Sequence, residues 1–378
     1  MEEASPPIEN KCLFFIHGLS GNGHVQGTAI RKALEKAGSD WKFYRCTYSD
    51  GDRATIVKTE TRTEDEVLEN EDDTFAVLGM LRGGLVQFSD LVYESIVRMH
   101  LGAEHEEPAA PDSDSDEYLS IEEEFTTSDE EGDVAHLLGE EMHEIQQQQQ
   151  QEPPTRSPPI THLALVGSSM GGLIARRVAL KLMRGKATVF AGVEFMTLGT
   201  VATPHIGVGE QRLFASWKAG VIARFLLGKL SLTARDLLWK TDFLTELADS
   251  EHMDALLQFR NRINYLPLRD DDVVSYESCA MLTRRPESFR ERLGDAPILE
   301  KPYLHEYSAE EWQNVDEERK NAIKHGELIG RVHDDPLWTS VVVNSDHRPL
   351  ASMYNREDRP LAGPMCEAVA RHFVARLG

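Results

Sequence analysis

The sequence of 378 residues predicts an α/β fold, a mostly parallel sheet with helices on both faces. Two observations carry this prediction. Short apolar runs of strand length alternate along the chain with longer stretches that have helical features, and parallel strands need such crossover segments between them. A Gly-x-Ser-x-Gly pentapeptide also lies at a junction between a strand-like run and a helix-like stretch.

The expected strands are short apolar runs. They are Lys11–Ile16, Trp41–Tyr48, Leu163–Val166, Val193–Leu198, Phe259–Leu266 and Leu337–Val343. The second of these runs is rich in aromatic residues, although its alternation of polar and apolar residues slips at Tyr44. Helices are expected at 74–100, after Gly172, and at 364–377, where a proline opens the last helix.

One α/β domain, residues 10–378, is expected to contain a long acidic insertion. The formal net charge is −24 at pH 7, and residues 102–160 hold 18 acidic residues against one arginine. Because this segment has few apolar residues and repels itself, burial cannot offset the entropy of ordering it, which predicts a disordered, glutamine-rich insertion. The insertion is either a solvated spacer or a target for an acidophilic kinase or another protein partner, through Ser113, Ser115, Ser120 and Ser128.

Composition argues against several classes of protein. The four cysteines are widely separated and form no Cys-x-x-Cys pair, so neither a disulfide framework nor a zinc site is indicated. The acidic balance argues against direct binding of nucleic acid. The N-terminus lacks the basic and apolar regions of a signal peptide, and no run approaches the ~18 apolar residues of a spanning helix. These features predict a cytoplasmic protein.

The pentapeptide Gly167–Gly171 supplies a candidate nucleophile. A strand ending there would place Ser169 on a strained strand-to-helix turn, beside a helix N-terminus that favours negative charge. Glycines at 167 and 171 avoid a collision where the helix folds back over the strand. The pentapeptide alone also occurs in ordinary glycine-rich turns, so the assignment of Ser169 depends on its partners.

A serine hydroxyl is activated by a base that a carboxylate orients. In α/β-hydrolases these groups follow in the order Ser, acid, His, on loops after later strands. Here Asp270–Asp272 follow the expected strand at 259–266, and His347 follows the strand at 337–343. An aspartate triplet is also common in solvated turns and a lone histidine is usually an ordinary residue, so agreement in order carries the assignment. Other histidines come earlier in the chain than this order requires; they are His205, His325 and His333.

The tetrahedral intermediate needs donors aimed at its oxyanion. One is expected from the N–H of Met170, which follows the nucleophile, and the other from an early strand-to-helix loop. The glycine-rich loop His17–Gly23 fits that place, and we expect the N–H of Leu19 to point into the site. The alternative, a phosphate-cradling loop, is disfavoured because the glycine spacing does not match Gly-x-Gly-x-x-Gly.

Residues 208–258 are expected to form a helical cap. Within it, Leu213–Leu232 combines apolar and aromatic residues with interspersed basic ones. This segment could admit acyl chains or contact a membrane or lipid droplet at its surface. It could equally be an amphipathic helix packed on the core.

Taken together, these motifs resemble the putative serine esterase family of α/β-hydrolases, which includes lipase-like proteins. The matching segments are Phe15–Leu19, Gly167–Gly172, Ala202–Gly207, Asp271–Val274 and Asp346–His347. The resemblance implies that Ser169 is the nucleophile, His347 the general base and then acid, and Asp271 the orienting carboxylate. The triplet leaves Asp270 and Asp272 as alternatives for the acid.

The predicted function is that of a serine esterase or lipase, acting on carboxylic esters such as acyl lipids through an acyl-enzyme. Neither a metal nor an organic cofactor is expected. Two alternatives remain: a hydrolase-fold protein that binds or scaffolds through its acidic insertion, and an acyltransferase or peptidase that uses the same triad. The presence of every required group favours the enzyme.

Overall fold

An eight-stranded sheet is the centre of the structure, which is a computed structural model. The structure describes residues 9–18, 27–49, 53–58, 73–102, 158–208, 232–238, 240–247, 249–268, 274, 276–280, 298–301, 338–345, 350 and 362–378. The chain divides into two units, one formed by residues 1–97 and 160–378 and the other by residues 98–159. Every described strand belongs to the first unit.

The strands are ordered β3-β2-β1-β4-β5-β6-β8-β7 across the sheet. The six central strands are parallel, and β3 and β7 are antiparallel edge strands. The bounds are β1 Lys11–Ile16, β2 Lys42–Ser49, β3 Arg53–Lys58, β4 His162–Ser168, β5 Glu194–Val201, β6 Asn261–Pro267, β7 Ile298–Lys301 and β8 Trp338–Val343.

The six parallel strands are those that the sequence predicts, with ends shifted by at most three residues. Their apolar runs are buried on both faces, which is typical of strands in the interior of a parallel sheet. The two edge strands were not predicted. Each pairs with one neighbour only, and β7 is four residues long.

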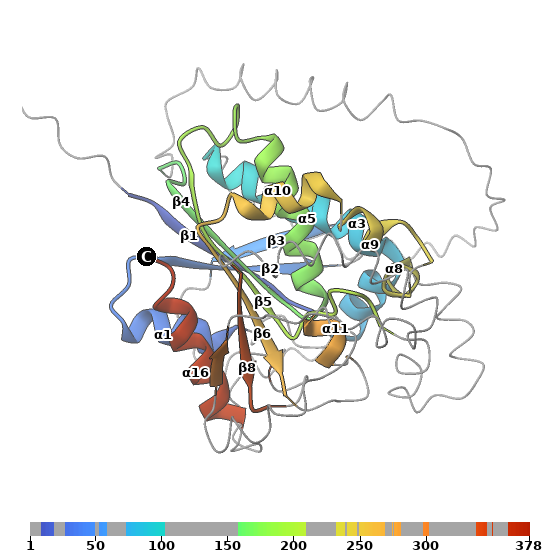
Figure 1. The fold of residues 1–378 in the computed structure, drawn as a ribbon. Coiled ribbons are helices and arrows are strands. Elements are labelled where there is room, and N and C mark those ends of the chain that lie inside the picture. The colour runs from blue at the N-terminus through green and yellow to red at the C-terminus, as the bar shows by residue number, and fades with distance from the viewer. Residues whose placement is uncertain are drawn as a thin grey trace, which may run out of the picture. The chain divides into compact units, whose positions relative to one another are not determined.

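Helices cover both faces of the sheet. On one face lie α1 and α16, and on the other lie α3, α5 and α10 (Figure 1). The helices are α1 Thr28–Lys36, α3 Asp73–His100, α5 Met170–Arg184, α8 Leu232–Leu237, α9 Phe243–Glu246, α10 Ser250–Leu257, α11 Tyr276–Ala280 and α16 Ala362–Val374. This architecture, with a serine at a strand-to-helix turn, is that of the α/β-hydrolases, so the predicted fold class is confirmed.

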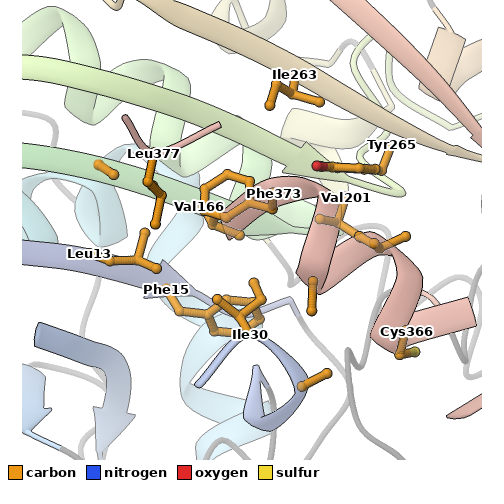
Figure 2. Packing of buried hydrophobic residues seen from close by; sticks show 14 of the residues in the cluster. Leu13, Phe15, Ile30, Val166, Val201, Ile263, Tyr265, Cys366, Phe373 and Leu377 are labelled. Carbon is orange, nitrogen blue, oxygen red and sulfur yellow. The ribbon is translucent and has the colours of Figure 1, made fainter. Parts of the chain in front are cut away.

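The core between the sheet and α1 with α16 is built from alternate residues of the strands. Figure 2 shows Leu13, Phe15 and Val166 of the sheet directed towards Ile30 of α1 and Phe373 of α16. All of these side chains are buried. The intervening residues of β1 point to the opposite face, because side chains alternate along a strand.

Three expectations about helices need correction. The helix expected at 74–100 is two helices that meet at Gly84, which has φ 71° and ψ 163°. The helix expected after Gly172 begins earlier, at Met170. The last helix begins at Ala362, so Pro364 lies inside its first turn, where the missing N–H costs no helical hydrogen bond.

Two predicted regions lie largely outside the described residues. The acidic insertion, 102–160, is described only at residue 102 and at 158–160. The predicted cap, 208–258, is described at residue 208 and from Leu232 onwards, where α8, α9 and α10 follow one another and α10 packs against α5. None of the helices in the described ranges is long and apolar enough to cross a membrane.

Candidate active site

Ser169 occupies a strained turn between β4 and α5, as the pentapeptide predicts. Strand β4 ends at Ser168 and α5 begins at Met170, and Ser169 has φ 52° and ψ −126°. Among non-glycine residues in the described ranges, only Ser169 and Ala202 have positive φ. Strain of this kind costs about 1–3 kcal/mol and persists where the surroundings over-determine it. Here the amide of Ser169 donates to the carbonyl of Val201, 2.8 Å away.

The two glycines of the pentapeptide are required by close approach of backbones. A Cβ at Gly167 would collide with the backbone of Gly171 and Gly172. A Cβ at Gly171 would collide with the carbonyl oxygen of Ile16 at the end of β1. The glycines therefore have the steric role that the sequence predicts. Without a Cβ at these positions, the backbones of β1, β4 and α5 can approach one another closely at the turn.

The loop that follows β1 contacts the nucleophile candidate directly. A Cβ placed on Gly18 would lie 2.6 Å from the Cβ of Ser169 and 3.2 Å from its Oγ. The neighbouring His17 is buried, and its Nδ1 lies 2.7 Å from the carbonyl oxygen of Gly18, so Nδ1 is the donor. Leu19, the expected second oxyanion donor, lies outside the described residues.

Met170, the expected first oxyanion donor, is the first residue of α5. The N–H groups of a first helical turn have no partner within the helix, and they carry the positive end of the helix dipole. The side chain of Ser169 makes no capping hydrogen bond to this turn. Negative charge that develops at the Ser169 turn would therefore meet N–H groups and a favourable dipole.

The expected acid and base fall outside the described residues. Asp270–Asp272 and His347 belong to segments for which no side-chain position is described. The strands that lead into these segments are described: β6 ends at Pro267 and β8 at Val343, and the two are parallel neighbours. Both segments therefore leave the same edge of the sheet as the Ser169 turn, because carboxyl ends of parallel strands share an edge.

His205 is buried in the turn after β5, and its hydrogen bonds fix its protonation. Arg176 Nη1 lies 3.2 Å from His205 Nδ1, and a guanidinium can only donate. His205 Nδ1 is therefore an acceptor, and Nε2–H donates to the hydroxyl of Thr200, 3.1 Å away. The imidazole is thus neutral with its lone pair already used, so in this arrangement His205 cannot take a proton from Ser169.

Arg176 is a residue that sequence reasoning missed. Its guanidinium is buried, which lowers its pKa to about 10, and it also donates to the carbonyl of Leu247 over 2.6 Å. In the described part of the chain no carboxylate pairs with it. The sequence does not distinguish Arg176 from its neighbour Arg177, because the two are identical and adjacent. In the structure Arg177 forms an ion pair with Glu246.

A metal or thiol site is not formed by the residues that the structure describes. Within these ranges no three His, Cys, Asp or Glu side chains gather as metal ligands. All four cysteines are buried and free. Burial raises the pKa of the Cys12 and Cys366 thiols to about 12, so these are not thiolates at neutral pH.

Part of the chain matches a known protein family. Residues 100–281 match the model of a family described as putative serine esterase (DUF676). The matched segment contains the Ser169 turn, His205 and the aspartate triplet. This match supports a hydrolase of the esterase class. No curated protein matches the chain.

Two solved structures of fungal esterases resemble the chain weakly. Carboxyl esterase 2 from the mycorrhizal fungus Tuber melanosporum is 9% identical with a TM-score of 0.41, over 98% of this chain and 80% of that one. An esterase from Rhizomucor miehei is 9% identical with a TM-score of 0.38, over 98% and 75%. The match to the putative serine esterase model covers residues 100–281, and it is consistent with the resemblance that the motifs of the chain predict.

Proposed function

We propose that this protein is a serine esterase of the lipase type, which hydrolyses carboxylic esters through an acyl-enzyme on Ser169. The observation that carries the proposal is the geometry of the Ser169 turn. The serine lies in a strained conformation at the N-terminus of α5, with Gly18 against its side chain. Such a turn holds a nucleophile at the edge of the sheet where substrates of α/β-hydrolases bind.

In the proposed mechanism His347 removes the hydroxyl proton of Ser169 while Oγ attacks the ester carbonyl carbon. Asp271 orients the imidazole and stabilises the imidazolium that forms. The tetrahedral intermediate collapses when His347 returns the proton to the leaving alcohol oxygen, which leaves an acyl group on Oγ. A water molecule, deprotonated by His347, then attacks the acyl carbon. The bond from the acyl carbon to Oγ breaks, His347 returns the proton to Oγ, and the carboxylic acid is released.

The oxyanion is assigned to the N–H groups of Met170 and Leu19. The first belongs to the opening turn of α5, where the helix dipole favours negative charge. The second belongs to the loop in which Gly18 contacts Ser169. Loss of one such donor typically costs ~2.7–4 kcal/mol of transition-state stabilisation.

Acyl lipids are the proposed substrates, and peripheral contact with a membrane or lipid droplet is part of the proposal. The support is the apolar and basic segment Leu213–Leu232, which ends at the first residue of α8. A series of p-nitrophenyl esters from acetate to palmitate tests this: we expect kcat/KM to rise with acyl length. A preference for acetate would refute the lipid substrate and leave the esterase intact.

A fluorophosphonate probe tests the nucleophile. We expect wild type to be labelled and Ser169→Ala to be unlabelled. The matched control is Ser95→Ala, because Ser95 donates to the carbonyl of Leu91 within α3 and should not affect labelling. Labelling that persists in Ser169→Ala would move the nucleophile elsewhere.

Two further outcomes distinguish the alternatives. A wild-type protein that neither labels nor hydrolyses esters would be a binding or scaffolding protein with a hydrolase fold. A protein that labels but transfers its acyl group to added glycerol faster than to water would be an acyltransferase. Release of free acid as the main product is the result expected here.

A further inference from the structure

A chain of four hydrogen bonds runs through the interior beside the Ser169 turn. The contributing side chains are almost completely buried, with exposed fractions of 3% or less. In order, Arg176 Nη1 to His205 Nδ1 measures 3.2 Å, His205 Nε2 to Thr200 Oγ1 3.1 Å, Thr200 Oγ1 to Asn264 Oδ1 3.0 Å, and Asn264 Nδ2 to the carbonyl oxygen of Cys279 2.8 Å.

The direction of every bond in this chain is determined. Arg176 can only donate, so His205 accepts at Nδ1 and donates from Nε2. The Thr200 hydroxyl accepts that proton and donates its own to Asn264 Oδ1, which leaves the amide Nδ2 to donate to a backbone carbonyl. One arrangement of protons satisfies all the members, and such networks make a buried site rigid.

The middle of this hydrogen-bond chain lies beside the nucleophile turn. Thr200 on β5 is the register partner of Gly167 on β4. The next residue, Val201, accepts the hydrogen bond from the amide of Ser169. A displacement of Thr200 would therefore be transmitted to the strained backbone of Ser169.

The Cys279 end of the chain joins the two elements that flank the aspartate triplet, called the acidic loop below, in the sequence. Asn264 belongs to β6, which ends at Pro267, and Cys279 belongs to α11, which begins at Tyr276. The aspartate triplet 270–272 lies in the sequence between these two elements. The bond from Asn264 to Cys279 thus joins the segment that enters the loop to the helix that follows it.

A further hydrogen bond links α11 to the turn after β5. The hydroxyl of Ser278 on α11 donates to the carbonyl of Gly207, in the turn that also carries His205. Arg176 is anchored in turn by its bond to the carbonyl of Leu247. The turn after β5 is therefore held between α5 on one side and α11 on the other.

We infer that this buried chain positions the acidic loop relative to the nucleophile turn, and that His205, Thr200 and Asn264 are positioning residues for the triad. The inference rests on the proposed esterase function. None of the three is proposed to touch substrate. They act by holding β6 and α11, the elements on either side of the aspartate triplet in the sequence, in a constant position relative to the turn of Ser169.

Thr200→Val tests the inference because valine keeps the shape of threonine and removes the hydroxyl in the middle of the chain. A misplacement of about 1 Å can cost roughly 100-fold in rate, so we expect kcat to fall roughly 10- to 100-fold with KM within about twofold of wild type. Thr200→Ser restores the hydroxyl and should recover most of kcat.

Thr197→Val is the matched control. Thr197 lies on the same strand and is fully buried, and its hydroxyl donates to the carbonyl of Arg376 over 2.8 Å. It should lower the melting temperature as Thr200→Val does while leaving kcat unchanged. If Thr200→Val lowers stability alone and keeps wild-type kcat, the positioning role is overturned.

His205→Gln and His205→Leu provide a second pair. Glutamine can accept from Arg176 with Oε1 and donate to Thr200 with Nε2, so it preserves the order of acceptor and donor. We expect His205→Gln to retain most of kcat and His205→Leu to lose it. Equal activity of the two variants would overturn the inference.

A measurement that needs no activity separates this inference from the proposed function. In ¹⁵N-histidine spectra of the whole protein, the signal that disappears in His205→Gln should show a neutral ring protonated at Nε2. A ring protonated at Nδ1 would overturn the hydrogen-bond chain itself. Absence of labelling in the wild type would instead refute the esterase, and with it the positioning role, even where the histidine spectrum agrees with the chain.

Discussion

The amide of Ser169 donates to the carbonyl of Val201 over 2.8 Å, and this bond ties the nucleophile turn to the end of β5. The residue after Val201 is Ala202, which has φ 50° and donates its amide to the carbonyl of Tyr265 on β6, 2.9 Å away. The two non-glycine residues with positive φ in the described ranges are therefore joined through one residue. The carboxyl ends of β4, β5 and β6 are thus linked by hydrogen bonds at the proposed site.

The contact between Gly18 and Ser169 predicts a loss of activity in Gly18→Ala. The new methyl group would lie 2.6 Å from the Cβ of Ser169, so either the loop or the nucleophile must move. We expect kcat/KM to fall by roughly 100-fold in ester hydrolysis, with the fold retained in circular dichroism.

Gly38→Ala is the control for that variant. Its φ of 61° is unfavourable for alanine, yet no atom lies within 4 Å of the added methyl group. It should lose about 1 kcal/mol of stability and keep full activity. Full activity in Gly18→Ala would contradict the proposed placement of the β1 loop at the site.

The assignment of the acid predicts unequal effects within the aspartate triplet. Asp271→Asn should lower kcat by about 10⁴-fold, because the imidazole then takes the wrong tautomer. Asp270→Asn and Asp272→Asn should each stay within about tenfold of wild type. The measurement is kcat of each variant on one ester under steady-state conditions. Equal small losses of kcat in all three variants would contradict the role assigned to Asp271.

Burial of His252 predicts a pH-dependent stability. Its pKa is lowered from the ordinary value of 6.5, first by burial, although Asp249 acts in the opposite direction. The unfolded chain therefore binds a proton more readily than the folded one, so stability is full above pH 6.5 and falls as the pH drops below it. Urea unfolding at pH 7.5, 6.5 and 5.5 should show this decline for wild type and a shallower one for His252→Gln. If the free energy of unfolding changed equally with pH in wild type and His252→Gln, the prediction would be refuted.

The kink in α3 predicts a structural role for Asp236. Its buried carboxylate accepts from the amide of Leu85, the first residue after Gly84, over 2.8 Å and from the hydroxyl of Thr241 over 2.7 Å. Asp236→Ala should therefore lower the free energy of unfolding by about 2 kcal/mol. Asp249→Ala removes the exposed cap of α10 and should cost about 1 kcal/mol, measured in the same urea titration. A smaller loss for Asp236→Ala than for Asp249→Ala would contradict this role.

Where the sequence pattern failed, long-range contacts supply the reason. The apolar pattern of residues 74–100 continues across Gly84, and the break is stabilised by Asp236, which is 151 residues from Leu85 in the chain. Strand β3 lies at the edge of the sheet through its antiparallel pairing with β2. Arg176 and Arg177 are identical neighbours in the sequence, and the packing of α5 buries only the first of them.

By itself the sequence determined the six parallel strands, the turn at Ser169 and the reason for its glycines. These features are local. A strand buried on both faces requires a continuous apolar run, and a backbone that passes too close to its neighbour for a Cβ requires glycine at that position. The tertiary structure alone decided which buried polar groups meet. The partners of His205 come from α5 and β5, and the bond from Asn264 to Cys279 joins β6 to α11. Such pairing depends on how distant elements pack, so the periodicity of the sequence does not predict it.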